Sequence, residues 1–380
     1  MSIVRFTAYK QELFAPRADG GFREEAFDGA AGRLGEFTGP AQIAGGKPHN
    51  DYLEDALADA AKKLKPRSPV LVMVHGFQFD PRDDVTGAIE RAENPHQRIY
   101  HFAAGRSGTP LDREKEHHTT GWPGRLGFAP DDGGEEGVAV AFGWYSNPGF
   151  FDSILGSSKD FHQLAYHFAG LTTWPFIAVL HALANAPRLA GREIDLFCHS
   201  LGSRVVVNAL VELARTAPQF PRLGEVLARI GRVILLGGSE RVPNGLMAAQ
   251  LAASGAAGKV AFYNAVLRKD EVLDHLAEKT HVAEFPLNQV LGHNGLAPLK
   301  PGNWLDLQLD GLALQRWCER NGTPIDGGVE KSFASHWVYY TYPDNMALYR
   351  RILRDRADWS VAGLRAEAIP DSVELEEGGN

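Results

Sequence analysis

The sequence has little cysteine, no dense basic run and no long apolar run, and each absence excludes a class of protein. Only two cysteines, Cys198 and Cys318, occur in 380 residues, which is too few for a disulfide framework. Their spacing matches neither a metal site nor a redox motif, so we expect both thiols to be reduced, buried and structural. The formal net charge of −8 gives no general attraction to nucleic acid or to an anionic membrane.

No stretch of the sequence reaches the roughly 18 apolar residues that a membrane helix needs. The segment Met1–Lys10 alternates polar and apolar residues and lacks the apolar core of a signal peptide. We therefore expect a cytoplasmic protein without stable membrane insertion and without a nucleic-acid partner. Hydrophobic residues make up 44% and charged residues 23% of the chain, as is usual for a globular protein with a sizeable core. The sequence does not indicate an oligomeric state.

Five short apolar runs predict the strands of a buried parallel sheet. They are Pro69–Val74, Gly137–Trp144, Glu193–Cys198, Arg232–Leu236 and Lys259–Ala265. Segments with helical spacing alternate with them, among them Asp51–Leu64, Phe161–Ala184 (interrupted at Pro175) and a final helix Asn345–Arg354. This alternation predicts an α/β fold with a mostly parallel, doubly wound sheet and helices on both faces. Ser2–Tyr9 is predicted as an edge strand.

The chain contains no internal repeat, so we expect one domain over residues 1–380 with a core at about 69–353. Residues 1–65 are interpreted as an N-terminal extension, and residues 94–136 as a long insertion with the character of a lid. The pair His117-His118 in this insertion lacks the spacing of metal ligands, so we expect no metal site.

The sharpest motif is Cys198-His199-Ser200-Leu201-Gly202, which lies between a predicted strand and a predicted helix. A serine hydroxyl becomes nucleophilic when a histidine takes its proton and a carboxylate orients that histidine. Enzymes that use it this way place the serine on a tight strand-to-helix turn with small neighbours. The motif predicts Ser200 as a nucleophile; the alternative is a serine that only caps a helix.

Backbone N–H groups near such a serine stabilise the oxyanion of the reaction. We predict Phe77 and Leu201 as the two donors, because Leu201 follows the serine and Phe77 follows His75-Gly76 at the end of an earlier strand. His75 and Gly76 are candidate pocket residues for the same reason. Trp144 and Tyr145, at the end of another strand, are candidates for lining an acyl pocket, with a place in the core as the alternative.

For the carboxylate, Asp270 is the leading candidate because it follows a predicted strand and would point into the crevice at the carboxyl end of the sheet. Asp274 and Glu240 are the rivals, and a helix cap is the alternative role for Asp270. For the histidine, His336 lies in a loop before the last predicted helix, and His293 in a glycine-rich loop is the runner-up. His275 and His281 are further candidates, whereas His199 is expected to be structural.

Four segments together resemble the α/β-hydrolase superfamily: Val72–Phe77, Cys198–Val206, Asn264–Asp270 and Ser335-His336. They most resemble an uncharacterised bacterial branch of esterase-like and lipase-like proteins. The resemblance covers roughly residues 69–353 and departs from the family pattern at Cys198, where a glycine is usual. It implies a Ser200–His336–Asp270 triad, no cofactor, and a small-molecule acyl substrate such as a carboxylic ester, cleaved through an acyl-enzyme. A lipase, thioesterase or acyltransferase on the same triad, or a binding protein that retains the fold without catalysis, are the alternatives.

Overall fold

The computed structural model describes residues 3–14, 33–44, 68–77, 79, 99–100, 121–128, 137–147, 158–254, 260–278, 289–296, 299–328 and 331–373. The predicted helix Asp51–Leu64 and candidate His281 lie outside these residues, as does most of the 94–136 segment.

A nine-stranded sheet in the order β3-β2-β1-β5-β4-β6-β7-β8-β9 forms the centre of the described structure. Its strands are β1 (Ile3–Tyr9), β2 (Glu12–Phe14), β3 (Arg33–Glu36), β4 (Val70–Val74), β5 (Val138–Trp144), β6 (Ile194–His199), β7 (Ile230–Leu236), β8 (Ala261–Val266) and β9 (Trp304–Gln308). All neighbours from β1 to β9 pair in parallel, whereas β2 and β3 add an antiparallel edge. The predicted α/β class with a mostly parallel sheet is therefore confirmed.

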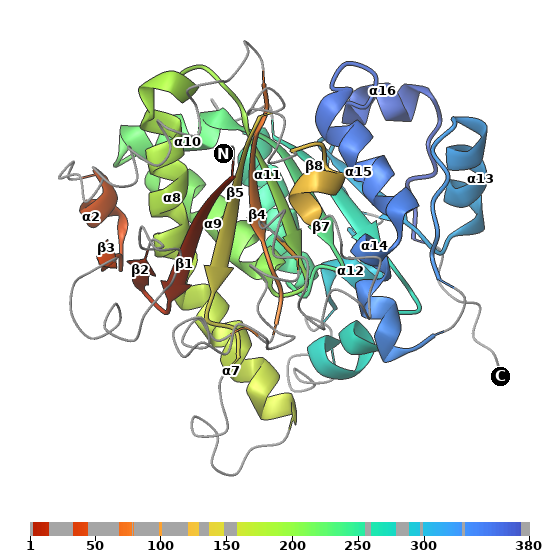
Figure 1. Cartoon of the computed structure of the whole chain (residues 1–380), viewed down its shortest axis with the longest axis horizontal. Helices are drawn as coiled ribbons and strands as arrows, with labels where there is room; N and C mark the ends of the chain where they lie inside the picture. The colour runs from red at the N-terminus through yellow and green to blue at the C-terminus, as the bar shows by residue number, and fades with distance from the viewer. Residues whose placement is uncertain are drawn as a thin grey trace, which may run out of the picture.

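The N-terminal strand has a different place from the one that we predicted. β1 lies between β2 and β5, and Ile3 pairs with Ala139, so β1 is an interior strand. The edge strand on this side is β3 (Figure 1). The described part of residues 1–65 thus extends the main sheet, and the sheet begins well before residue 69.

The alternation of side chains along the strands separates two apolar layers. On β4, Val70, Val72 and Val74 belong to one buried cluster, and Leu71 and Met73 belong to another. The first cluster is completed by α7 (Ser158–Leu171), α8 (Thr173–Asn185), α9 (Gly202–Thr216), α10 (Pro221–Arg229) and α11 (Val242–Ala253). The second is completed by α6 (Trp122–Arg125), α13 (Leu312–Arg320), α14 (Val338–Thr341), α15 (Pro343–Arg354) and α16 (Val361–Ala366). Helices therefore cover both faces of the sheet.

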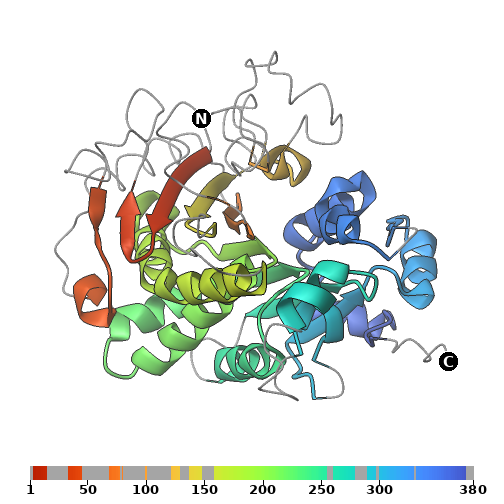
Figure 2. The same cartoon turned by 90° about the horizontal axis from the view of Figure 1, so that it is seen from below.

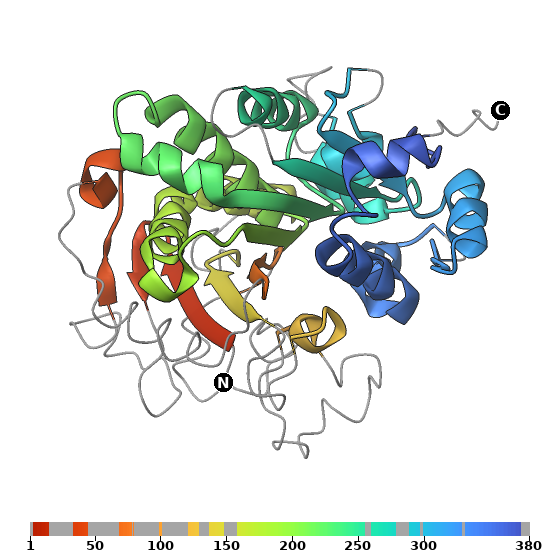
Figure 3. The same cartoon turned by 90° about the horizontal axis from the view of Figure 1, so that it is seen from above.

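The figures show this arrangement directly. In Figure 1 the red strands β1 and β2 lie at one side of the molecule and the blue helices α13, α15 and α16 at the other. Figures 2 and 3 show the green helices packed together along the sheet, apart from the blue ones. Five smaller elements complete the described structure: α2 (Pro40–Ala44), α12 (Leu291–Asn294), η3 (Pro187–Leu189), η5 (Leu273–Glu278) and η7 (Phe333–Trp337).

The long apolar segment that we predicted as one interrupted helix forms two helices. α7 ends at Leu171 and α8 begins at Thr173, so the break lies at Thr172, and Pro175 sits in the first turn of α8. Proline is tolerated there because the first turn lacks intrahelical acceptors for its N–H groups. In contrast to the expectation from the sequence, Phe161–Asn185 is long and apolar enough to cross a membrane; 72% of its most apolar window is buried inside the fold, as in a core helix.

Two described pieces of the 94–136 segment are anchored in the second apolar layer. The Tyr100 hydroxyl donates to the carbonyl oxygens of Met73 and Phe142, both at 3.1 Å. Trp122 on α6 is buried and its ring lies edge-on to Phe197 of β6. The segment is therefore attached to the sheet next to the strands that carry the candidate site.

Candidate active site

Ser200 lies on the tight turn between β6 and α9 in a strained backbone conformation. Its φ is +53°, a region that non-glycine residues rarely occupy and that is often found at functional sites. Several hydrogen bonds hold the turn: the Ser200 N–H donates to the Leu236 carbonyl at 2.9 Å, and the Ser200 carbonyl accepts from Ser203 Oγ at 2.6 Å and from the Ser239 N–H at 3.1 Å. These bonds fix a tight strand-to-helix turn with the serine at its apex.

Two glycines allow other backbone segments to approach this turn closely. A β-carbon on Gly202 would lie 2.5 Å from the His75 carbonyl oxygen and 2.7 Å from that of Val74. A β-carbon on Gly76 would lie 2.7 Å from the Cβ of Ser200. Since real β-carbons do not come so close to neighbouring atoms, these positions require glycine, and the end of β4 packs directly against Ser200.

Cys198 occupies the position where the family pattern has its first glycine. It is an ordinary strand residue of β6, paired with Val74 and Leu235, and its side chain is buried in the first apolar layer. Burial raises the pKa of the Cys198 thiol well above its usual value, so the thiol stays protonated and unreactive. The strained φ lies at Ser200 and not at Cys198, so a side chain at Cys198 is accommodated.

The structure brings His336 and Asp270 together. His336 lies on η7, Asp270 lies four residues beyond the end of β8, and His336 Nδ1 is 2.8 Å from Asp270 Oδ2. Asp270 is fully buried, and its other oxygen, Oδ1, accepts from the N–H groups of Val272 at 3.0 Å and Leu273 at 3.2 Å. One oxygen of this carboxylate therefore caps the turn that follows, while the other contacts the histidine.

The rival carboxylates have other partners. Glu240 is fully buried; its Oε1 accepts from the Tyr166 hydroxyl at 2.7 Å, and its Oε2 pairs with Arg204 Nη1 at 3.0 Å. Asp274 is partly exposed and lies 3.6 Å from Lys331 Nζ. Neither carboxylate contacts His336 among the described residues.

The rival histidines also have other contacts. His293 also lies beside a carboxylate: its Nδ1 is 3.2 Å from Glu278 Oε1 but forms no hydrogen bond among the described residues, and its Nε2 is 3.3 Å from the Arg268 carbonyl oxygen. His275 is partly exposed, and its Nδ1 lies 3.1 Å from the Glu271 carbonyl oxygen. His293 thus has both ring nitrogens close to partners, whereas His336 uses only Nδ1 and its backbone carbonyl in the described contacts.

His199, next to the nucleophile in the chain, supports the segment that carries His336. Its Nε2 lies 2.9 Å from the His336 carbonyl oxygen and the two rings are 4.5 Å apart. Because a carbonyl only accepts, Nε2 of His199 carries the proton. Burial, reinforced by the neighbouring His336, lowers the pKa of His199 well below its usual value, so the ring is neutral. The structural role expected of His199 is thus a link between β6 and η7, which sequence spacing did not reveal.

The hydroxyl of Ser200 has a partner that the sequence did not suggest. Ser200 Oγ lies 3.2 Å from Ser239 Oγ, at the end of β7. Among the described residues, no hydrogen bond joins Ser200 to His336. The structure thus places Ser200 and His336 at the carboxyl end of the same sheet, without a direct hydrogen bond between them.

The two predicted oxyanion donors lie beside Ser200. Leu201 is the N-cap of α9, and Phe77 follows Gly76, which packs against the serine. Neither backbone N–H donates a hydrogen bond to another residue in the described part of the chain. The helix that begins after Leu201 also places its positive dipole end toward this point.

The remaining pocket candidates lie in the core. Trp144 and Tyr145 have 0% exposed surface, and the ring of His75 stacks on Trp144 at 5.7 Å. The backbone N–H of Trp144 donates to His75 Nε2 at 2.9 Å. The proton of the neutral His75 ring therefore lies on Nδ1, which donates it to the Gly76 carbonyl at 2.8 Å. Burial lowers the pKa of His75 to about 3. These side chains therefore shape the turn beside Ser200, and Trp144 and Tyr145 have no surface for a substrate.

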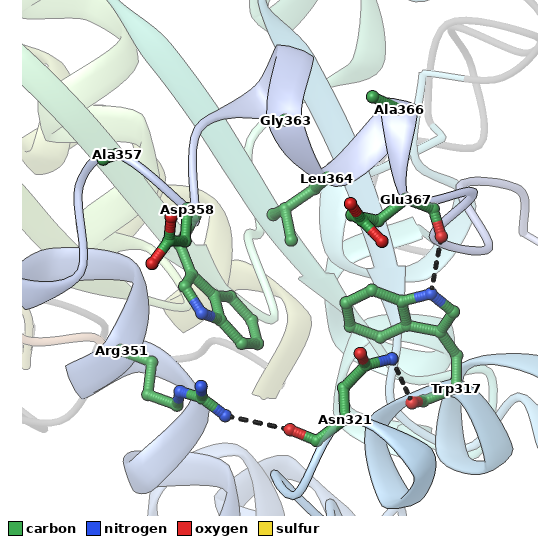
Figure 4. A pocket seen from close by; sticks show the side chains of 10 residues that line it. Trp317, Asn321, Arg351, Ala357, Asp358, Gly363, Leu364, Ala366 and Glu367 are labelled. Carbon is green, nitrogen blue, oxygen red and sulfur yellow. Dashed lines mark hydrogen bonds between the residues drawn. The ribbon is translucent and has the colours of Figure 1, made fainter.

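A cavity of about 400 Å³ lies elsewhere, between α13, α15 and α16. Figure 4 shows the Trp317 indole donating to the Glu367 backbone and Arg351 reaching the Asn321 carbonyl. None of the predicted site residues lines this cavity. The described residues contain no group of three or more His, Cys, Asp or Glu side chains arranged for a metal ion.

Comparison with known proteins gives a match to a family. Residues 51–239 match a family described as alpha/beta hydrolase of unknown function (DUF900), a range that contains β4, Ser200 and Ser239. No curated protein and no solved structure matches the chain.

Proposed function

Because the chain belongs to the α/β-hydrolase superfamily, we propose that it is a serine hydrolase that cleaves carboxylic esters or related acyl compounds through an acyl-enzyme on Ser200. The observation that carries the proposal is the strained Ser200 turn at the same sheet edge as a buried His336–Asp270 pair. A left-handed backbone at a serine between a strand and a helix is typical of nucleophile turns.

In the proposed mechanism Asp270 holds the proton of His336 on Nδ1, which leaves the lone pair of Nε2 free. The Ser200 side chain turns from Ser239 toward His336, and Nε2 takes the hydroxyl proton as Ser200 Oγ forms a bond to the acyl carbon. The electron pair of the carbonyl bond moves to its oxygen, which the N–H groups of Phe77 and Leu201 stabilise.

When the intermediate collapses, the bond to the leaving group breaks, and His336 returns its proton to the departing alkoxide. Water then attacks the acyl-enzyme, with His336 as base in the same manner, and regenerates the Ser200 hydroxyl. Apart from the substrate and water, every group that these steps use comes from the chain itself, so the proposal needs no metal or cofactor.

Two exposed aromatic side chains support apolar acyl substrates. Phe333 is 49% and Trp337 is 45% exposed, and both lie on η7 with His336 between them. Among the described residues only Leu299 and Leu312 are comparable exposed apolar side chains. Apolar surface beside a reacting group favours substrates with an apolar acyl or alcohol part. Lipase or thioesterase activity remains the second candidate on this ground.

A fluorophosphonate probe tests the proposal. The intact protein is expected to be labelled, Ser200→Ala to lose labelling, and Ser254→Ala, which removes an exposed serine hydroxyl away from the site, to keep it. Absence of labelling in the intact, folded protein would favour a binding protein that retains the fold. Persistent labelling in Ser200→Ala would show that another residue is the nucleophile.

A further inference from the structure

The carboxylate of Asp270 accepts one hydrogen bond that the proposed mechanism does not use. Besides the two backbone donors on Oδ1, Oδ2 accepts from His336 Nδ1 at 2.8 Å and from the Tyr339 hydroxyl at 3.2 Å; the same hydroxyl lies 3.4 Å from the Gly292 carbonyl oxygen, a longer contact. A fully buried carboxylate is stable in its charged form only when hydrogen bonds replace water. Four donors do so here, and two of them share one oxygen.

Tyr339 is held firmly in this position. It lies at the start of α14, three residues after His336, and it is fully buried. Its ring packs against Gly237, where a β-carbon would lie only 2.5 Å from the tyrosine Cε2. Burial raises the pKa of the Tyr339 hydroxyl well above its usual value, and the nearby charge of Asp270 acts in the same direction. The hydroxyl therefore keeps its proton and can act as a donor throughout the working pH range.

We propose that Tyr339 is a positioning residue of the active site, which competes with His336 for Oδ2 of Asp270 and so limits how strongly Asp270 stabilises protonated His336. The inference rests on the proposed function, because it concerns the acid and base of that site. It goes beyond the triad in assigning a task to a fourth side chain.

The proposal predicts the direction in which the pH dependence of activity changes when the Tyr339 hydroxyl is removed. A hydrogen bond from Tyr339 withdraws negative charge from Oδ2, so its removal leaves more charge to stabilise the imidazolium form of His336. The base then keeps its proton to higher pH, and activity on the acidic side is lost at higher pH. The other titratable groups that face this cluster are His199, beside His336, and Asp310 and Tyr349, near Tyr339. All three stay in place when only the Tyr339 hydroxyl is removed.

The test compares Tyr339→Phe with Tyr349→Phe. Tyr349 is also fully buried, on α15, and its hydroxyl has no hydrogen-bond partner among the described residues. Both variants keep the ring and lose one buried hydroxyl, which makes them a matched pair. We expect the acidic midpoint of the kcat/KM profile to rise by about 0.5 pH unit or more in Tyr339→Phe, with KM unchanged, and to stay in place in Tyr349→Phe.

An unchanged midpoint in Tyr339→Phe, or an equal rise in both variants, would overturn the proposal. A second measurement does not depend on turnover: the low-field NMR resonance of the His336 Nδ1 proton, identified by its loss in His336→Ala, is expected to move in Tyr339→Phe only. If Ser200→Ala kept full activity, the proposed function would fail. If Ser200→Ala were inactive and neither midpoint nor resonance moved, only the role of Tyr339 would fail.

Discussion

Gly76 and Ser200 face each other so closely that a β-carbon on Gly76 would lie 2.7 Å from the Ser200 Cβ. The end of β4 and the turn after β6 are therefore fitted to each other at one point, where a predicted oxyanion donor meets the proposed nucleophile. Each half of this contact would be an ordinary strand end if it stood alone.

Gly76→Ala is expected to reduce fluorophosphonate labelling strongly, on the order of 100-fold, because the added methyl group must displace Ser200 or the Phe77 N–H. Gly302→Ala is the matched control, since nothing lies within 4 Å of the position its β-carbon would take. Circular dichroism would establish that both variants fold. Normal labelling of folded Gly76→Ala would show that the contact is not part of the working site.

His336→Ala is expected to lower kcat/KM on a chromogenic ester on the order of 1,000-fold, the usual contribution of a general acid and base. His293→Ala, which removes the other buried histidine paired with a carboxylate, is expected to change it less than about threefold. The reverse order of effects would assign the base to His293.

Ser239→Ala is expected to raise the labelling rate by roughly twofold to tenfold. The variant removes the 3.2 Å contact that holds the Ser200 hydroxyl at rest, and one hydrogen bond contributes about 0.5–1.5 kcal/mol. The rate of fluorophosphonate labelling, measured with the probe in excess, gives this change. A fall of tenfold would instead mean that Ser239 contacts the reacting group.

Phe333→Ala and Trp337→Ala are each expected to lower kcat/KM for an octanoate ester by about tenfold while leaving the acetate ester nearly unchanged. The loss corresponds to about 1.4 kcal/mol, which is in the range for partial burial of an aromatic side chain against an acyl chain. Leu312→Ala, at a 62% exposed leucine on α13, is the control. Equal losses on both esters would argue against an acyl contact.

His75→Gln is expected to flatten the dependence of stability on pH. The folded protein holds the pKa of His75 at about 3, below its value of 6.5 in an unfolded chain, so between these values only the unfolded state takes up a proton. The free energy of unfolding therefore falls as pH falls through this window, by up to about 1.4 kcal/mol per pH unit. Urea unfolding from pH 7 to pH 4 is expected to show a smaller slope in the variant. Equal slopes would mean that His75 is protonated in the folded state.

Local sequence patterns predicted most of the sheet, because buried parallel strands are almost wholly apolar. They failed at β9, whose Asp306 is fully buried and accepts hydrogen bonds from Asn264, on the neighbouring strand, and from Leu296. Asn264 lies 42 residues away in the sequence, and no local pattern reveals that such a partner makes a polar residue fit a core position. The place of β1 was missed for the same reason, since it depends on pairing with β5.

In the candidate site, too, local sequence predicted single residues but not the contacts between distant segments. Ser200, Asp270 and His336 were selected because each follows a structural element in a recognisable way, and their chemical roles stay predictions. The contacts of Ser239, His199 and Tyr339 with these residues come from separate strands and helices, so only the folded chain shows them. Trp144 and Tyr145 had the right position for a pocket but lie in the core, because a strand end alone does not determine which side chains remain exposed.

The ordinary strand conformation of Cys198 has a consequence for recognising related sequences. Glycine is required by close packing at Gly76 and Gly202, and the left-handed backbone belongs to Ser200, whereas position 198 only needs a side chain that fits the core. A search pattern that demands glycine two residues before the serine would overlook this chain. A pattern built on the serine, the glycine two residues after it and the histidine-glycine pair after β4 would find it.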